Sequence, residues 1–210
     1  MGFLGRLAGV FFSPAKTTRT IAEKPVWLDA CIILLIVIVG FTCLVIPHAR
    51  MLDQAGKPFW PNQLICALFL THLYFLGFVV SSLVLLIAGR LVSGGGHYTQ
   101  VFSLFVYASF IDKILGNAVR LFLFSPDTSA FKAATSIARF FPHPDENGFI
   151  SALSVQIDFF QIWLFAVIGI GLAAIFKMDV KKAMCVSYGF WLFKSVINAV
   201  LIQLGMSLFG

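Results

Sequence analysis

Long apolar stretches separated by short polar segments dominate this chain. Five of them are long enough, at about 18 residues or more, to cross the hydrocarbon core of a bilayer. They cover residues 27–46, 64–92, 99–124, 151–176 and 183–209. Backbone groups in hydrocarbon must form hydrogen bonds with one another, so each stretch is predicted to be an α-helix. The pattern therefore predicts an all-α, polytopic membrane protein with five transmembrane helices in one domain, residues 26–210.

Residues 1–25 form a separate segment ahead of the first span. Its apolar side chains recur at helical spacing, with Arg6 on the opposite side; they are Phe3, Leu4, Leu7, Val10 and Phe11. Ser13-Pro14 is typical of the start of a second helix, which would end before Pro25. We interpret both helices as cytoplasmic, either lying in the membrane interface or packed on the helical bundle as a cap.

The longest segment between two spans, residues 125–148, contains another amphipathic stretch. Within residues 129–141, one helical face would carry Phe131, Ala134, Ile137, Ala138 and Phe141. Lys132 and Arg139 lie away from that face. The pattern predicts a short interfacial helix on the outer side, before the fourth span.

The composition agrees with a lipid environment. Of the 210 residues, 60% are hydrophobic and only 11% are charged, whereas about a quarter of the residues in soluble domains are charged. The formal net charge is +6. In so apolar a chain, this excess favours contact with anionic lipid headgroups and does not indicate nucleic-acid binding.

Lys and Arg residues are unequally divided between the two sides of the membrane. With the N-terminus inside, the inner segments hold Arg6, Lys16, Arg19, Lys24, Arg90, Lys177, Lys181 and Lys182. The outer loops hold Arg50, Lys57, Lys132 and Arg139. Because cytoplasmic loops are enriched in Lys and Arg, we place the N-terminus in the cytoplasm and the C-terminus outside, after five spans.

Ionisable and amide side chains occur inside the predicted spans, where each charge costs roughly 3 kcal/mol at the helix centre. Counting residues at about 1.5 Å each places a set of them in one layer near the midplane. This set is His72, Asp112, Lys113, Gln161, Lys194 and Asn198. Arg120 and Asp158 lie further out, where we expect them to pair.

Within this layer, Asp112 and Lys194 lie at matched depth on the third and fifth spans, which run in the same direction. Neither charge is tolerated alone in hydrocarbon, so we expect the two to form an ion pair or to share a small polar cavity. Asp112 and Lys113 are neighbours in sequence, and we expect them to point in different directions.

Three consecutive glycines interrupt the apolar pattern between the second and third spans. They are Gly94, Gly95 and Gly96. Glycine adopts φ > 0 without steric penalty, which suits a tight reversal between adjacent helices. Bare N–H groups beside a helix N-terminus can instead hold an anion such as a lipid headgroup, framed here by Arg90, His97 and Tyr98. Nucleotide binding is not expected, because the pattern G-x-x-x-x-G-K-[ST] is absent.

Several short motifs follow one another in a recognisable order. They are Phe12-Ser13-Pro14, Ile21, Lys24-Pro25, a Gly-Gly turn followed by Tyr98, Tyr107-Ala108, Trp163 and Lys181-Lys182-Ala183. The order of these motifs and the five predicted spans resemble the bacterial branch of the Yip family over nearly the whole chain. The members of this family are integral membrane proteins named for interaction with Ypt/Rab GTPases. The resemblance implies this family's fold and topology, and a bacterial inner membrane as the location.

The chain departs from that family in two places. The proline that typically follows the Tyr-Ala pair is replaced by Ser109-Phe110-Ile111, so the resemblance does not carry over a proline kink in the third span. The long cytoplasmic N-terminal region of eukaryotic members is missing, so GTPase binding is not expected. The expected partners are membrane lipids, a second copy of the chain or other membrane proteins.

Three classes of function compete for the charged layer. A structural or interaction protein would use it to hold helices together, and a small transporter or channel would use it as a pathway for ions, protons or lipids. An enzyme is not indicated, because H-E-x-x-H and G-x-S-x-G are absent. The four cysteines lack metal-ligand spacing, so no metal site and no cofactor is expected. We expect a non-enzymatic protein for membrane organisation or partner scaffolding, with the transporter or channel as alternative.

The predicted topology can be tested with reporter fusions. A reporter that is active only outside the cytoplasm should be active when fused after Gly210, because the Lys and Arg residues favour an inner N-terminus. A fusion near Gly95, in a predicted inner loop, is the control and should be inactive. Activity of a cytoplasm-only reporter at Gly210 would contradict the topology.

Overall fold

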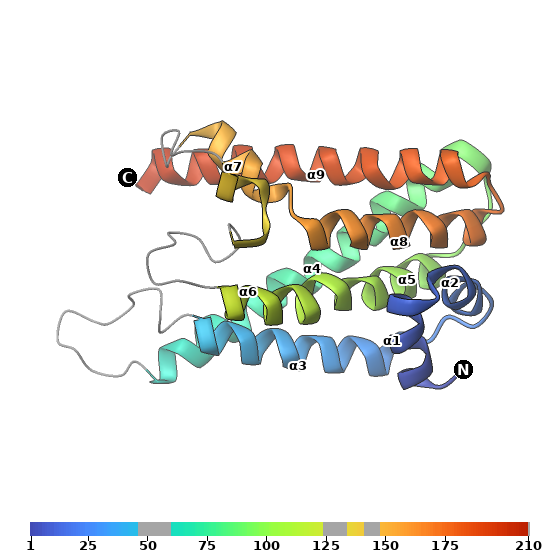
Figure 1. Cartoon of the computed structure of the whole chain (residues 1–210), viewed down its shortest axis with the longest axis horizontal. Coiled ribbons are helices and arrows are strands. Elements are labelled where there is room, and N and C mark those ends of the chain that lie inside the picture. Colours follow the sequence, from blue (N-terminus) through green and yellow to red (C-terminus); the bar gives the residue numbers. More distant parts are fainter. Residues whose placement is uncertain (46–59, 124–133, 141–147, 210) are drawn as a thin grey trace.

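The computed structural model describes residues 1–45, 60–123, 134–140 and 148–209. Within these ranges, long helices lie side by side along one direction (Figure 1). They are α3 (Leu28–Val45), α4 (Trp60–Ser93), α5 (Tyr98–Phe110), α6 (Asn117–Leu123), α8 (Phe159–Phe176) and α9 (Val180–Phe209). The prediction of an all-α, polytopic membrane protein is confirmed.

Four helical stretches in the described residues are long and apolar enough to cross a membrane. They are Ala67–Ser93, Tyr98–Leu123, Phe159–Phe176 and Val180–Ile202. Helix α3, which corresponds to the first predicted span, is apolar and has 18 residues, so it is about 27 Å long. That length is close to the hydrocarbon thickness of about 30 Å.

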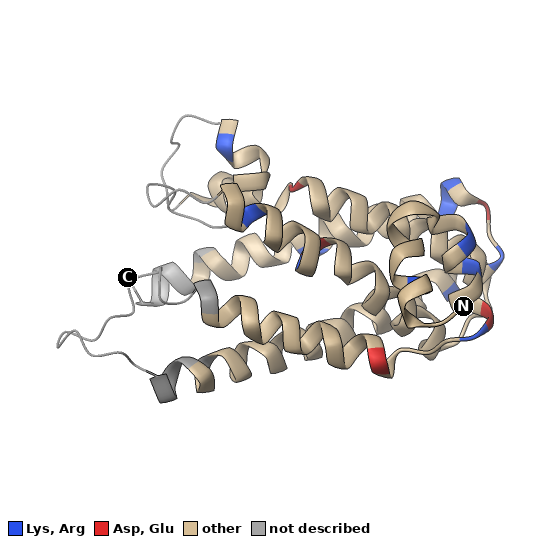
Figure 2. Ribbon diagram, turned by 60° about the horizontal axis from the view of Figure 1, so that its bottom comes forward, with Lys and Arg blue, Asp and Glu red and all other residues tan. Residues whose placement is uncertain are grey.

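Two short helices precede the bundle, as expected from the sequence. Helix α1 (Phe3–Phe12) and helix α2 (Pro14–Glu23) lie across one end of the long helices, which we call the α2 end (Figure 1). The opposite end, which carries α7 (Phe149–Gln156), is called the α7 end. Figure 2 shows that most of the described Lys and Arg residues gather at the α2 end.

Helix α1 packs on the bundle as a cap. Phe3 and Leu7 pack against the core, and the ring centroids of Phe11 and Trp163 are 6.0 Å apart. Leu4 is exposed, as expected for a side chain that faces lipid in the interface. Arg6 was expected on the side of α1 opposite the apolar residues, but its side chain is only 5% exposed and α1 packs against α5.

Helix α5 is central to the bundle. Every side chain from Val101 to Phe110 is buried, and α5 contacts α2, α3, α4 and α8. After Phe110 the third span continues as a π-helical segment, η2 (Ile111–Gly116), before α6 resumes α-helical geometry. The α-helical geometry of the third span is therefore interrupted without a proline, at a position that no residue pattern predicts.

The fourth predicted span, residues 151–176, is two helices. Helix α7 ends at Gln156, and α8 begins at Phe159. Asp158 caps α8, because its carboxylate accepts hydrogen bonds from the backbone N–H groups of Phe160 at 2.8 Å and Gln161 at 3.4 Å. The break leaves α7 beside α9 and only α8 as the span.

Of the short interfacial helix predicted over residues 129–141, the structure describes residues 134–140, which are mostly helical but of the 3₁₀ type. Ala134 and Thr135 are 3₁₀-helical, and a second 3₁₀ helix, η4 (Ile137–Phe140), follows Ser136. The backbone instead pairs with the start of α8: Ser136 forms an isolated bridge with Asp158, and the N–H group of Ile137 donates to Ile157 O at 3.0 Å. Residues 129–133 and 141 lie outside the described residues.

The glycine turn joins α4 to α5 at the α2 end. Gly94, Gly95 and Gly96 have φ values of 71°, 74° and 68°. Gly96 also packs on the buried ring of Phe176, so that an added Cβ atom would lie 2.5 Å from Cε1 of that ring. At Gly94, nothing lies within 4 Å of an added Cβ.

These two glycines form a matched pair for mutagenesis. Gly94→Ala should destabilise the protein by roughly 1–2 kcal/mol, because only the left-handed backbone is strained. Gly96→Ala should destabilise it more, by roughly another 1–3 kcal/mol for overpacking against Phe176. Reversible unfolding in mixed detergent micelles measures both values. Equal losses would show that Phe176 yields to the added methyl group.

Candidate functional site

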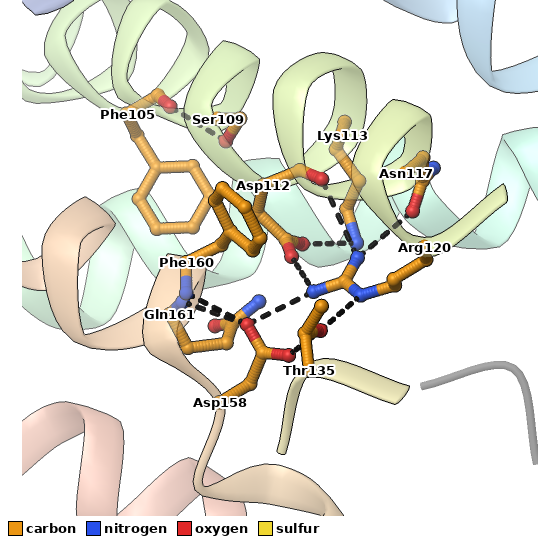
Figure 3. Close-up of polar contacts among 10 residues, drawn as sticks. All are labelled: Phe105, Ser109, Asp112, Lys113, Asn117, Arg120, Thr135, Asp158, Phe160 and Gln161. Carbon is orange, nitrogen blue, oxygen red and sulfur yellow. Dashed lines mark hydrogen bonds and ion pairs between the residues drawn. The ribbon is translucent and has the colours of Figure 1, made fainter. Parts of the chain in front are cut away.

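Arg120 is the centre of a buried network of charges near the α7 end. Its side chain is 2% exposed. Nη2 lies 2.8 Å from Oδ1 of Asp112 and 3.0 Å from Oδ1 of Asp158 (Figure 3). One guanidinium group therefore joins the third span to the first residue before α8.

The other nitrogens of Arg120 also have partners. Nε donates to Oγ1 of Thr135 at 2.9 Å, and Nη1 donates to Oδ1 of Asn117 at 2.9 Å (Figure 3). The hydroxyl group of Thr135 donates in turn to the carboxylate of Asp158. Residues 134–140 are thus attached to both sides of the network. These hydrogen bonds are needed, because a buried charge without partners destabilises a protein by several kcal/mol.

Lys113 supplies the second cation of the network. Its Nζ atom lies 2.9 Å from Oδ2 of Asp112 and 4.8 Å from the ring centroid of Tyr74 on α4. The expectation that Asp112 and Lys113 point apart is therefore wrong. A π-helical turn contains about one residue more than an α-helical turn, so neighbours are separated by a smaller angle, and the long Lys113 side chain turns back.

Two carboxylates and two cations make the network electrically neutral. Asp112 and Asp158 are 1% and 3% exposed, and Lys113 is 15% exposed. Gly116 leaves room for the side chains of Phe160 and Arg120. An added Cβ at Gly116 would lie 3.1 Å from Cγ of Phe160 and 3.2 Å from Nη1 of Arg120. We call the set the charge network: Asp112, Lys113, Asn117, Arg120, Thr135 and Asp158.

The structure brings together only part of the predicted layer. The expected pairing of Arg120 with Asp158 is present, whereas the ion pairs that the structure gives Asp112 are with Lys113 and Arg120 rather than with Lys194. Lys194 lies on α9, and α8 is the helix that contacts both α9 and η2 (Figure 1). Arg120 lies further along the same span as Asp112 and reaches back to it.

The remaining members of the layer are dispersed. His72 is exposed on α4, where its Nδ1 lies 2.7 Å from Leu68 O. Gln161 contacts the network through its backbone N–H group, which donates to Asp158. Asn198 is partly buried on α9. Sequence analysis missed Asn117, which its spacing of three residues from Arg120 could have indicated, and Thr135, for which no sequence signal exists.

The side chains around the glycine turn form hydrogen bonds with backbone groups of the turn and of α4. Arg90 donates from Nε to Gly95 O at 3.2 Å and from Nη2 to Gly96 O at 2.9 Å. The hydroxyl group of Tyr98 donates to Val79 O at 3.3 Å, and the N–H group of His97 donates to the side chain of Gln100. Because Arg90 binds the carbonyl groups of the turn, the geometry favours the tight reversal over the anion site.

Comparison with known proteins gives one match. A family model described as the Yip1 domain matches residues 8–202, nearly the whole chain. No curated protein and no solved structure matches the chain at a significant level.

The charge network can be tested by a double-mutant cycle. Arg120→Met alone should destabilise the protein by roughly 3–5 kcal/mol, because it leaves two buried carboxylates with only Lys113. Adding Asp158→Asn should recover much of this loss, since asparagine restores neutrality and still caps α8. Free energies of unfolding in mixed micelles measure the coupling.

Lys113→Met is the control for that cycle. It removes a partly exposed cation while Arg120 still pairs with Asp112, so the loss should be smaller. Additive effects of Arg120→Met and Asp158→Asn would show that the two side chains are not coupled.

Proposed function

The chain belongs to the family of membrane proteins with a Yip1 domain, and we propose that it is a non-enzymatic scaffold that organises the membrane or holds partner proteins within it. The observation that carries this proposal is the closed charge network. Each of its four charges is paired inside the protein, and the charges cancel. A network of this kind clamps helices together, whereas a pathway for ions needs sites that can release and rebind their cargo.

The absence of enzymatic activity is part of the same proposal. His72 is bonded to a backbone carbonyl group on its own helix, and Asp158 is occupied by Arg120, Thr135 and the start of α8. Neither is placed as a general base beside a nucleophile, the arrangement that nucleophilic catalysis requires.

The basic α2 end supports a cytoplasmic orientation for α1 and α2. The described cations there are Arg6, Lys16, Arg19, Lys24, Arg90, Lys177, Lys181 and Lys182, against the acids Glu23, Asp29 and Asp179 (Figure 2). Such an excess is retained on the cytoplasmic side and is attracted to anionic lipid headgroups. In a bacterial inner membrane this end would face the cytoplasm.

Helix α9 offers a face for partners. Only 17% of its membrane-spanning window is buried inside the protein, against 72% for the third span. Its exposed side chains include Leu192, Phe193 and Leu201. A second copy of the chain or another membrane protein could pack there, as expected of a scaffold.

One observation favours a small transporter as the second candidate. The π-helical segment and the break between α7 and α8 bring irregular backbone and charges to one layer of the bundle. Broken helices that meet in one layer form the substrate sites of many transporters. The cargo would be an ion, a proton or a lipid.

Reconstitution into liposomes separates the two functions. We expect ion, proton and lipid-flipping rates equal to those of protein-free liposomes, because each charge of the network is already paired within the protein. Crosslinking of native membranes should capture partners or a second copy equally well for the wild type and for the folded variant R120M/D158N. Transport by the wild type that this variant loses would establish the conduit instead.

A further inference from the structure

An open apolar groove lies beside the charge network at the α7 end. Its volume is about 690 Å³, and its walls are α6, residues 134–140 and the start of α8. The apolar side chains that shape it include Val119, Leu123, Ile137, Phe140, Phe159 and Ile162. Phe160 separates the groove from Arg120, whose guanidinium carbon lies 5.7 Å from the ring centroid. The size is typical of a ligand site, and the lining is typical of a site for an apolar chain.

One charged residue lines this groove, among the residues that the structure describes. It is Arg139, which is exposed and whose Nη1 donates a single long hydrogen bond, 3.4 Å, to Ala134 O. Unlike Arg120, Arg139 forms no ion pair within the described part of the chain. An apolar groove with one available cation at its rim complements a molecule with an apolar chain and one negative charge.

The depth of the groove identifies that molecule. Helix α8 runs for 18 residues from Phe159 at the groove to Phe176 at the α2 end, a distance of about 27 Å. This is close to the hydrocarbon thickness of about 30 Å, so the groove lies where acyl chains meet headgroups on the α7 side. Phe140 and Phe122 are 81% and 92% exposed near this level, as expected of residues in contact with lipid.

We propose that the groove binds one phospholipid with an anionic headgroup, with an acyl chain between α6 and α8 and the phosphate on Arg139. A phosphatidylglycerol headgroup fits, because it carries a net negative charge and has no ammonium group to oppose Arg139. The bound lipid covers residues 134–140, which attach to Arg120 and Asp158 through Thr135. It therefore stabilises the charge network from outside. This proposal rests on the membrane placement of the chain and not on its proposed function.

Photocrosslinking tests the site directly. The protein is placed in nanodiscs that contain a trace of phosphatidylglycerol with a photoreactive acyl chain, and adducts are located by peptide mass spectrometry. Adducts should concentrate on residues 134–140 and 157–162, and unlabelled phosphatidylglycerol should compete better than phosphatidylcholine. Ile162→Trp should fill the groove and abolish these adducts, while Ile33→Trp, at a position on α3 with a similar exposed fraction, should leave them unchanged.

The headgroup contact has its own matched variants. Arg139→Gln should reduce the preference for phosphatidylglycerol by about fivefold, as expected for one cation near a charged surface. Arg19→Gln, an exposed cation on α2, should leave the preference unchanged. If Ile162→Trp fails to fold, Leu123→Trp fills the groove from the opposite wall.

Two results would overturn the proposal. Adducts spread evenly over all lipid-facing helices would show ordinary annular lipid, and a lipid preference unchanged by Arg139→Gln would remove the headgroup contact. Neither result bears on the scaffold function, which the liposome and crosslinking experiments test separately.

Discussion

A single guanidinium group determines how this bundle is built at its α7 end. Arg120 is buried in a region surrounded by lipid, where an unpaired charge is strongly unfavourable, and it meets both Asp112 and Asp158. To reach both carboxylates, the third span must place Asp112 and Arg120 on one side, and the chain before α8 must bring Asp158 to the same point. The π-helical segment and the break between α7 and α8 are the two backbone irregularities at which this occurs.

These irregularities also explain why residues 134–140 fold into the bundle. Non-helical backbone is tolerated at membrane depth only where protein or a cavity surrounds it. Here Ser136 pairs with Asp158 through the backbone, and the hydroxyl group of Thr135 fills the last positions around Arg120 and Asp158. The segment closes the charge network on one side and forms a wall of the apolar groove on the other. A lipid in that groove would therefore act on the same element that completes the network.

The two ends of the bundle are held by different physical means. At the α2 end, the glycine turn wraps around the ring of Phe176, Ser93 donates to Phe176 O at 3.0 Å, and α1 and α2 cover the core. At the α7 end, ion pairs replace this close apolar packing. The chain therefore has a basic surface at one end and an apolar groove at the other, with the buried helix α5 between them.

The sequence by itself determined the class of fold, because runs of apolar residues of bilayer length leave the backbone few alternatives to a helix. It also determined α1, α2 and the glycine turn, whose signals are local: Pro14 at a helix start and three glycines that permit φ > 0. Only the tertiary structure decided the partner of Asp112. Residue counting gives depth along a helix but not which helices are neighbours, and α8 proved to be the helix in contact with both α9 and η2. Thr135 joined the network for the same reason, since a loop residue is brought to its site by packing alone.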